Sequence, residues 1–220
     1  MSSPSQPSGF TTGRDRTLPR VYLITDGTAS GPEVDLTAVG DALAAGVRMV
    51  QLREKSLPDR DLLAVARRLR ALTARFDACL LINGRPDIAR LADADGVHLP
   101  QAGLPVAVVR GQLGRTAVIG VSCHSAAEVV VAADAGADFV VFGPIYPTPS
   151  KAAYGPPPGI AALRAVLASA TLPIFALGGI DPSRLVEVAA TGVHGVAAIR
   201  ALYRPGGAEC FCAAFPVPRP

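Results

Sequence analysis

The sequence lacks the features that mark several specialised classes of protein. No apolar run in its 220 residues reaches the roughly 18 residues of a membrane-spanning helix. The first 20 residues contain no apolar stretch of the kind found in export signals. No block of like charges occurs, and a formal net charge of +3 gives little attraction for nucleic acid. We therefore expect a cytoplasmic protein that binds neither membranes nor nucleic acid.

Cysteine is also scarce, and its pattern indicates no zinc site. The four cysteines are not arranged as two closely spaced pairs, which is the pattern of a structural zinc site. They are Cys79, Cys123, Cys210 and Cys212. In a cytoplasmic setting such thiols stay reduced, and most of them pack as small apolar side chains.

Hydrophobic residues, by contrast, are abundant and recur in short runs. They make up 50% of the chain, against 18% charged residues, which is the composition of a globular domain with a large core. Eight runs rich in Val, Ile and Leu span 21–25, 47–52, 79–82, 96–99, 117–121, 138–142, 173–177 and 195–199. These runs are continuous and not alternating, which predicts parallel strands buried on both faces.

The segments between these runs have a helical periodicity. One face of a predicted helix carries Leu62, Leu63, Ala66, Leu69 and Leu72. Eight alternations of strand and helix predict a single-domain α/β fold, the (β/α)8 TIM barrel. An open, doubly wound sheet is the alternative. The barrel is favoured because no Gly-x-Gly-x-x-Gly motif follows the first strand, where a dinucleotide-binding fold would have it.

The barrel is expected to occupy residues 20–203. Residues 1–19 are rich in Ser, Pro, Gly, Thr and Arg and show no apolar period, so they are predicted to form a disordered tail. Residues 204–220 contain a short helix-compatible stretch around 208–215 before a proline-rich end. They predict only a weak terminal helix and a second tail.

Polar residues follow most of the predicted strands, at the end of a barrel where active sites lie. Gly178 and Gly179 follow the seventh strand, and Arg200 follows the eighth. Glycine lets the backbone approach an anion closely, and the start of the next helix would present N–H groups to it. These three residues predict a phosphate site, although a Gly-Gly pair alone is also consistent with a tight turn.

A second set of polar residues combines cations with hydroxyl groups. Arg53 and Lys55 follow the second strand. The loops after the fifth and sixth strands supply Ser122, Thr148, Ser150 and Lys151. Cations and hydroxyls that converge on one opening suit a phosphate or a pyrophosphate. The alternative is that they are solvated loop residues.

Three histidines are candidates for proton transfer. His124 precedes a capping-box pattern, Ser125 to Glu128, which places its imidazole near a helix N-terminus and favours the neutral ring. It could exchange protons with a substrate or pack in the loop. The adjacent Cys123 is a second candidate proton donor or a filler. His98 is as consistent with a structural role, and His194 precedes the eighth strand, on the face of a barrel that serves stability.

Seven motifs, in order, resemble those of one family. They are Val21-Tyr-Leu-Ile-Thr-Asp26, Gln51-Leu-Arg-Glu-Lys55, Ile82-Asn-Gly-Arg-Pro-Asp-Ile-Ala89, Ala94-Asp-Gly-Val-His-Leu99, Gly120-Val-Ser-Cys-His-Ser125, Phe142-Gly-Pro-Ile-Tyr-Pro-Thr148 with Ser150-Lys151, and Leu177-Gly-Gly-Ile180. The chain resembles the thiamine phosphate synthases and their close relatives, the thiazole tautomerases, as far as Leu202. The resemblance implies a TIM barrel, a role in thiamine biosynthesis, and substrate contacts from Gln51 and Asn83 as well.

The chain departs from the synthase pattern at the metal site. Synthases join a hydroxymethylpyrimidine pyrophosphate to a thiazole phosphate, and the resemblance implies Mg²⁺ held by an Asp after the third-strand Asn and another after the fourth-strand Gln. Those positions are Gly84 and Gly103. Since Mg²⁺ is usually held through one or two carboxylates plus substrate phosphates, this loss should weaken metal-assisted departure of pyrophosphate.

Tautomerases resemble the chain at Asn83-Gly-Arg85 and at Leu99-Pro100, and their proton transfer needs no metal. The histidine that the resemblance implies after the sixth strand is Pro144, which leaves His124 as the candidate base. The main hypothesis is a metal-independent thiazole tautomerase with no cofactor. The alternative is a thiamine phosphate synthase using Mg²⁺, and the second alternative is a catalytically silent phosphate-binding barrel. Partners are a phosphorylated thiazole and, for the synthase, a pyrimidine pyrophosphate; a homo-oligomer is left open.

Overall fold

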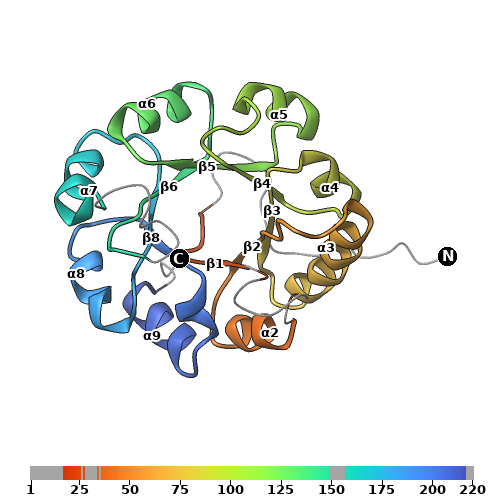
Figure 1. Cartoon of the computed structure of the whole chain (residues 1–220), viewed down its shortest axis with the longest axis horizontal. Helices are drawn as coiled ribbons and strands as arrows, with labels where there is room; N and C mark the ends of the chain where they lie inside the picture. The colour runs from red at the N-terminus through yellow and green to blue at the C-terminus, as the bar shows by residue number, and fades with distance from the viewer. Residues whose placement is uncertain (1–16, 26, 28–33, 35, 149–156, 217–220) are drawn as a thin grey trace.

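Eight parallel strands close into a barrel, in the order of the chain (Figure 1). The computed structural model describes residues 17–25, 27, 34, 36–148 and 157–216. The strands are β1 Val21–Ile24, β2 Met49–Leu52, β3 Cys79–Asn83, β4 Gly96–Leu99, β5 Val118–Cys123, β6 Phe139–Phe142, β7 Ile174–Leu177 and β8 Gly195–Ala198. Because β1 pairs with both β2 and β8, the sheet has no edge. The barrel prediction is confirmed, and the open-sheet alternative is wrong.

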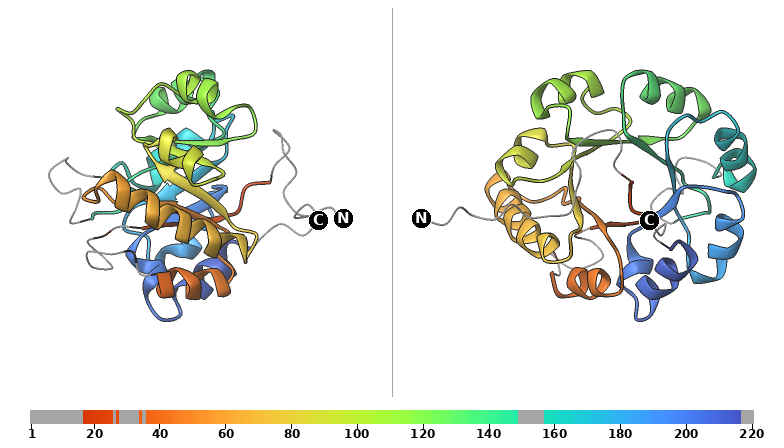
Figure 2. Two further views of the ribbon diagram at one scale, coloured as in Figure 1. Left: turned by 90° about the vertical axis from the view of Figure 1, so that its right-hand side faces the viewer. Right: turned by 180° about the vertical axis from the view of Figure 1, so that it is seen from behind.

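Helices form a ring outside the strands, as Figure 2 shows from the side and from behind. They are α2 Leu36–Ala44, α3 Asp59–Ala74, α4 Pro86–Leu91, α5 Val106–Leu113, α6 Ala126–Asp134, α7 Gly159–Leu167, α8 Leu185–Ala189 and α9 Gly207–Ala214, with 3-10 turns η2 Pro182–Arg184 and η3 Arg200–Tyr203. Among the described helices, none combines the length and apolarity of a membrane span.

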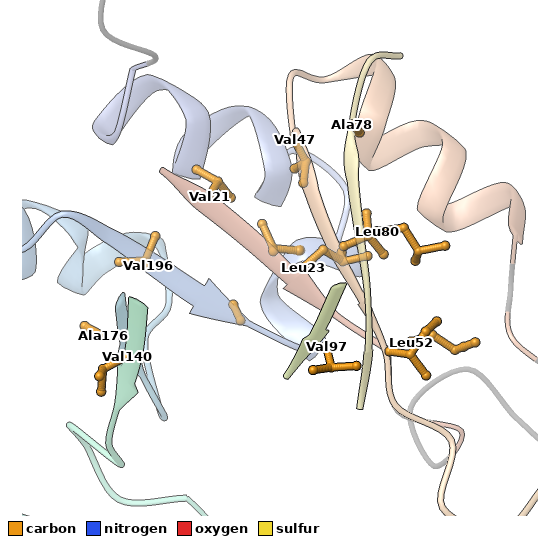
Figure 3. Close-up of a cluster of buried hydrophobic side chains, with 14 of the residues drawn as sticks. Val21, Leu23, Val47, Leu52, Ala78, Leu80, Val97, Val140, Ala176 and Val196 are labelled. Carbon is orange, nitrogen blue, oxygen red and sulfur yellow. The ribbon is translucent and has the colours of Figure 1, made fainter. Parts of the chain in front are cut away.

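Strand alternation separates two apolar layers. Successive side chains of a strand point to opposite faces, so alternate residues face the helices. Figure 3 shows this outer layer, in which Leu23, Leu80 and Val97 lie among other buried aliphatic residues. The outer layer holds most of the core, and the inner layer fills the barrel.

Aromatic rings fill the inner layer. The rings of Tyr22, Phe139 and Phe175 meet edge to face, with centroids 5.3 to 5.8 Å apart. Edge-to-face contacts are the favoured arrangement of aromatic pairs. Gly120 provides room for this packing, because a Cβ there would collide with the Phe139 ring. The interior is therefore a packed core, and ligands must bind at an end of the barrel.

The two ends of the described chain both add to the core. Leu18, which the sequence analysis assigned to the tail, is buried in the inner layer. Residues 1–16 and 217–220 of the predicted tails lie outside the described residues. The terminal helix α9 buries Phe211 completely, and Phe215 directly after it is almost completely buried, so this segment is part of the outer layer and not a weak terminal helix.

Candidate active site at the C-terminal mouth of the barrel

Gln51 is held inside the barrel near its C-terminal end. Its Nε2 donates a hydrogen bond of 2.7 Å to the hydroxyl of Tyr22, and both side chains are buried. Burial raises the pKa of Tyr22 well above its usual value, which keeps the phenol protonated. The substrate contact of Gln51 stays a prediction. The Gln51–Tyr22 pair places two buried polar groups beneath the mouth.

Arg53 follows β2 on the same face as Gln51. Its backbone nitrogen donates to Thr25 Oγ1 at 2.9 Å, which fixes the exit of the chain from β2 against the end of β1. The residue is half-buried, and its positive charge contributes to lowering the pKa of His98. Lys55, two residues further on, is exposed.

His98 and Ser122 join β4 to β5 at the mouth. Nε2 of the imidazole and Oγ of the hydroxyl are 2.8 Å apart. Burial, and to a smaller extent the charge of Arg53, lower the pKa of His98 to about 3, so the ring is neutral at physiological pH. His98 is 3% exposed, whereas Ser122 is half-buried and closer to solvent.

His124 and Cys123, the two candidate catalytic residues, have opposite environments. His124 is exposed, and its Nδ1 lies within hydrogen-bond distance of the Gly143 carbonyl. Because a carbonyl only accepts, Nδ1 carries a proton, and when the ring has one proton its lone pair lies on Nε2. Cys123 packs into the outer layer, and burial raises its pKa to about 12. Cys123 therefore faces the helices and not the mouth, and its role in proton transfer stays a prediction.

The turn after β7 has the glycine conformations that its sequence predicts. Gly178 and Gly179 have φ values of 104° and 65°, a region that other residues rarely adopt. A Cβ on Gly178 would lie 2.6 Å from Pro144 Cβ, and one on Gly179 would lie 2.7 Å from Tyr146 Cβ. The turn is thus packed against the start of the β6–α7 loop, whose Tyr146 nitrogen donates to the Gly178 carbonyl at 3.0 Å.

The helix start after this turn is not available to an anion, contrary to our expectation. Asp181 caps it, accepting from the Ser183 nitrogen at 2.9 Å, and only the short η2 and α8 follow. An anion at Gly178–Gly179 would therefore meet the backbone of the turn alone. Arg200, at the start of η3, is exposed.

A cavity of about 340 Å³ lies between the ends of β2 and β3 and the first turns of α3. Its lining comprises Leu52, Glu54, Lys55, Leu57, Asp59, Leu62, Asn83, Gly84 and Arg85. Asn83 and Lys55, both predicted to bind substrate, thus share one opening. Thr148 is half-buried on the β6–α7 loop, whereas Ser150 and Lys151 lie outside the described residues, as does Asp26.

The described residues do not fit a magnesium ion held by paired carboxylates. Gly84 and Gly103 stand where the resemblance implies Asp. Arg85, next to Gly84, binds one carboxylate of the lining and one of α4: its Nη1 is 2.6 Å from Asp59 Oδ1, and its Nη2 is 2.7 Å from Asp87 Oδ2. These bonds lower the pKa of both carboxyls, and the guanidinium offsets one of their two negative charges. Among the described residues, no three His, Cys, Asp or Glu side chains gather at a metal-binding distance.

Sequence reasoning missed the inner members of this site. Tyr22 was interpreted only as part of a strand, and His98 was left open between a structural and a chemical role. The signal that could have found them is strand alternation: Tyr22, Gln51, His98 and Ser122 all fall on inward-facing positions.

A closed parallel barrel with cationic, hydroxyl and imidazole groups at the C-terminal ends of its strands is the arrangement of barrel enzymes that act on small molecules. A family model described as thiamine monophosphate synthase matches residues 21–202. The chain therefore belongs to the thiamine monophosphate synthase family.

Individual relatives agree with this assignment. "Putative thiamine-phosphate synthase" of Geobacter sulfurreducens is 54% identical over 182 residues, which cover 83% of this chain and 85% of the relative. Thiamine-phosphate synthase of Clostridium novyi is 38% identical over 185 residues, 84% of this chain and 91% of the relative. The solved structure of thiamine phosphate pyrophosphorylase from Pyrococcus furiosus has a TM-score of 0.80 and 30% identity, covering 89% of this chain and 95% of that chain.

Proposed function

We propose that the protein joins hydroxymethylpyrimidine pyrophosphate to thiazole phosphate and releases pyrophosphate, which is the thiamine phosphate synthase reaction. The names of the relatives support this reaction, which was the alternative hypothesis from the sequence. They do not support the main hypothesis, the tautomerase. The observation that carries the proposal is the His98–Ser122 pair at the mouth, where the positive charge of Arg53 also contributes to lowering the pKa of His98. The site combines a cation with a hydroxyl, both of which suit the binding of a pyrophosphate.

The reaction needs charge stabilisation more than proton transfer. The bond between the pyrimidine methylene carbon and the pyrophosphate oxygen breaks, and its electron pair leaves with the pyrophosphate. The lone pair of the thiazole nitrogen forms the new carbon–nitrogen bond. Arg53 and Lys55 would bind the charge that develops on the leaving group, and preorganised groups of this kind are a major source of rate enhancement. The Gly178–Gly179 turn would hold the thiazole phosphate.

The test is a coupled assay with both precursors, in the presence of Mg²⁺ and in the presence of a chelator. We expect thiamine phosphate and pyrophosphate to form in equal amounts. Formation of neither product, with or without Mg²⁺, would sink the proposal.

The same assay can locate a metal requirement. Gly84→Asp adds the missing carboxylate, and Gly84→Asn has the same shape without the charge. Gly84 has φ 65°, which Asp and Asn tolerate better than most residues. If carboxylate loss limits the metal, only Gly84→Asp should raise the Mg²⁺-dependent rate. Gly103→Asp is tested second, because its Cβ would lie 2.9 Å from the Pro100 carbonyl oxygen and the backbone would have to shift to accept it.

The tautomerase remains a second candidate because of one observation: His124 is exposed, and its Nδ1 is bonded to the Gly143 carbonyl, which leaves Nε2 as the basic nitrogen. A neutral imidazole with a free lone pair can act as a general base. The coupling reaction needs no such base. His124→Ala should therefore leave coupling nearly unchanged if the protein is a synthase, and should abolish aromatisation of the thiazole carboxylate phosphate if it is a tautomerase.

A further inference from the structure

His98 is a buried polar side chain that the proposed reaction does not use directly. Its ring lies between the rings of Tyr22 and Phe139, with centroids at 6.0 and 5.9 Å. Nδ1 is buried and has no hydrogen-bond partner among the described residues. The other nitrogen, Nε2, is 2.8 Å from Ser122 Oγ. The side chain thus makes one polar contact, and that contact leads to the mouth.

The unpaired nitrogen indicates where the ring proton lies. The ring is neutral, so one nitrogen carries a proton and the other a lone pair. Buried N–H groups without an acceptor are rarer in proteins than buried acceptors without a donor. The proton therefore belongs on Nε2, where it has an acceptor. In this tautomer His98 donates and Ser122 Oγ accepts.

This direction determines what the serine can do. A hydroxyl has one proton and two lone pairs. When a lone pair of Ser122 is occupied by His98, its own proton is left for another acceptor. Ser122 is less buried than His98, and Arg53 lies near the same imidazole, so an anion at the mouth is the acceptor within reach.

We propose that His98 is a positioning residue: through its Nε2–H it orients the Ser122 hydroxyl as a donor to the pyrophosphate group of the substrate. The proposal rests on the proposed function, because it takes the anion to be a pyrophosphate. It assigns to His98 no contact with the substrate itself.

Two conservative substitutions test this role. His98→Gln places an amide near the position of Nε2 and can keep the donor to Ser122. His98→Asn places its amide near the position of Nδ1 and cannot reach the serine. The probe is inorganic pyrophosphate, titrated by calorimetry into each folded variant. We expect His98→Asn to weaken the Kd about tenfold, as for the loss of one hydrogen bond to a charged group, and His98→Gln to retain most of the affinity.

A double-mutant cycle distinguishes positioning from simple packing. If His98 acts through the hydroxyl, His98→Asn should have little further effect on pyrophosphate affinity in a Ser122→Ala background. Additive losses would overturn the proposal, as would equal affinities of the Asn and Gln variants. His194 is the matched control, because its ring packs on Phe175 at 5.1 Å at the other end of the barrel. His194→Asn and His194→Gln should leave the affinity unchanged.

The outcomes separate this proposal from the proposed function. If the wild-type chain performs coupling but its pyrophosphate affinity is insensitive to Ser122→Ala, the positioning role fails and the function stands. If the wild-type chain neither couples the precursors nor binds pyrophosphate, both fail.

Discussion

The two ends of the barrel use arginine in opposite ways. At the N-terminal end, Arg70 Nη1 binds Asp95 Oδ2 at 2.6 Å, and the same carboxylate oxygen accepts from the Leu80 nitrogen at 2.8 Å. Arg110 and Asp138 form a second pair of this kind, in which the carboxylate also accepts from the Ile119 nitrogen. We call each such group of an arginine, an aspartate and a strand nitrogen a bracket. At the C-terminal mouth, Arg53 and the His98–Ser122 pair stand around the site proposed for the anion.

The difference separates stability from function within one fold. Each N-terminal bracket ties a helix to two neighbouring strands, because the arginine comes from a helix and the carboxylate also binds a strand nitrogen. The charged groups of each bracket are therefore paired with one another in the folded chain. The polar groups at the mouth are backed by a packed aromatic interior, and their substitution should affect ligands more than folding.

The largest expected effect comes from removing the cation at the mouth. Arg53→Met should lower kcat/KM of the coupling reaction by about 10² to 10³, as for the loss of one preorganised electrostatic group. Arg110→Met is the matched control at the other end and should change kcat/KM by less than about threefold. Steady-state kinetics of both variants check this, and a comparable loss in Arg110→Met would break the contrast between the ends.

Two glycines with positive φ offer a second matched pair. Gly178→Ala adds a Cβ that would lie 2.6 Å from Pro144, whereas a Cβ on Gly192, φ 79°, meets nothing within 4 Å. Gly178→Ala should therefore lower both the free energy of unfolding and the affinity for the thiazole phosphate. Gly192→Ala should lower only the free energy of unfolding, by about 1 kcal/mol, through backbone strain. Urea unfolding and ligand titration measure the two effects, and a loss of affinity in Gly192→Ala would contradict the assignment.

The buried His98 should make stability depend on pH. Its pKa is about 3 in the folded chain against 6.5 when exposed, so between these values only the unfolded state binds the proton. Its contribution is complete above pH 6.5 and is lost as the pH falls. We expect stability to drop by about 2 kcal/mol from pH 7 to pH 5 on this account. His98→Gln should show a smaller drop in urea unfolding; an identical drop would assign the pH dependence to other groups.

The smallest expected effect is that of breaking one bracket. Asp138→Asn removes the charge that binds Arg110 Nη2 and weakens the bond from the Ile119 nitrogen, 2.7 Å long. The pair is partly solvated, so the loss in free energy of unfolding should be about 1 kcal/mol. Urea unfolding at pH 7 measures it, and the coupling rate should stay within about twofold. If Asp138→Asn lowered the coupling rate well beyond twofold, the reaction would depend on the N-terminal end of the barrel, which would contradict the account.

The fold could be predicted because its signal is local. All eight apolar runs are strands, and a continuous run indicates burial on both faces without any knowledge of its neighbours. Leu18 was missed because a single leucine after a polar stretch carries no period. The cap at Asp181 was missed because the helix start was placed directly after the glycine turn.

The site could be predicted only in outline, because its geometry depends on strand register. The run at 117–121 was expected to end at Val121, so Ser122 and Cys123 were interpreted as loop residues with no defined direction. β5 continues to Cys123, and the alternation then points Ser122 inward and Cys123 outward. The partner of His98 depends on the pairing of β4 with β5, which no local pattern reveals.

Titration of inorganic pyrophosphate into the wild-type chain, Arg53→Met and Arg110→Met, in the absence of Mg²⁺, tests most directly whether the C-terminal mouth is an anion site. The account predicts that the wild-type chain and Arg110→Met bind with the same Kd, and that Arg53→Met binds at least about tenfold more weakly. Equal binding by Arg53→Met, or a selective loss in Arg110→Met, would contradict it.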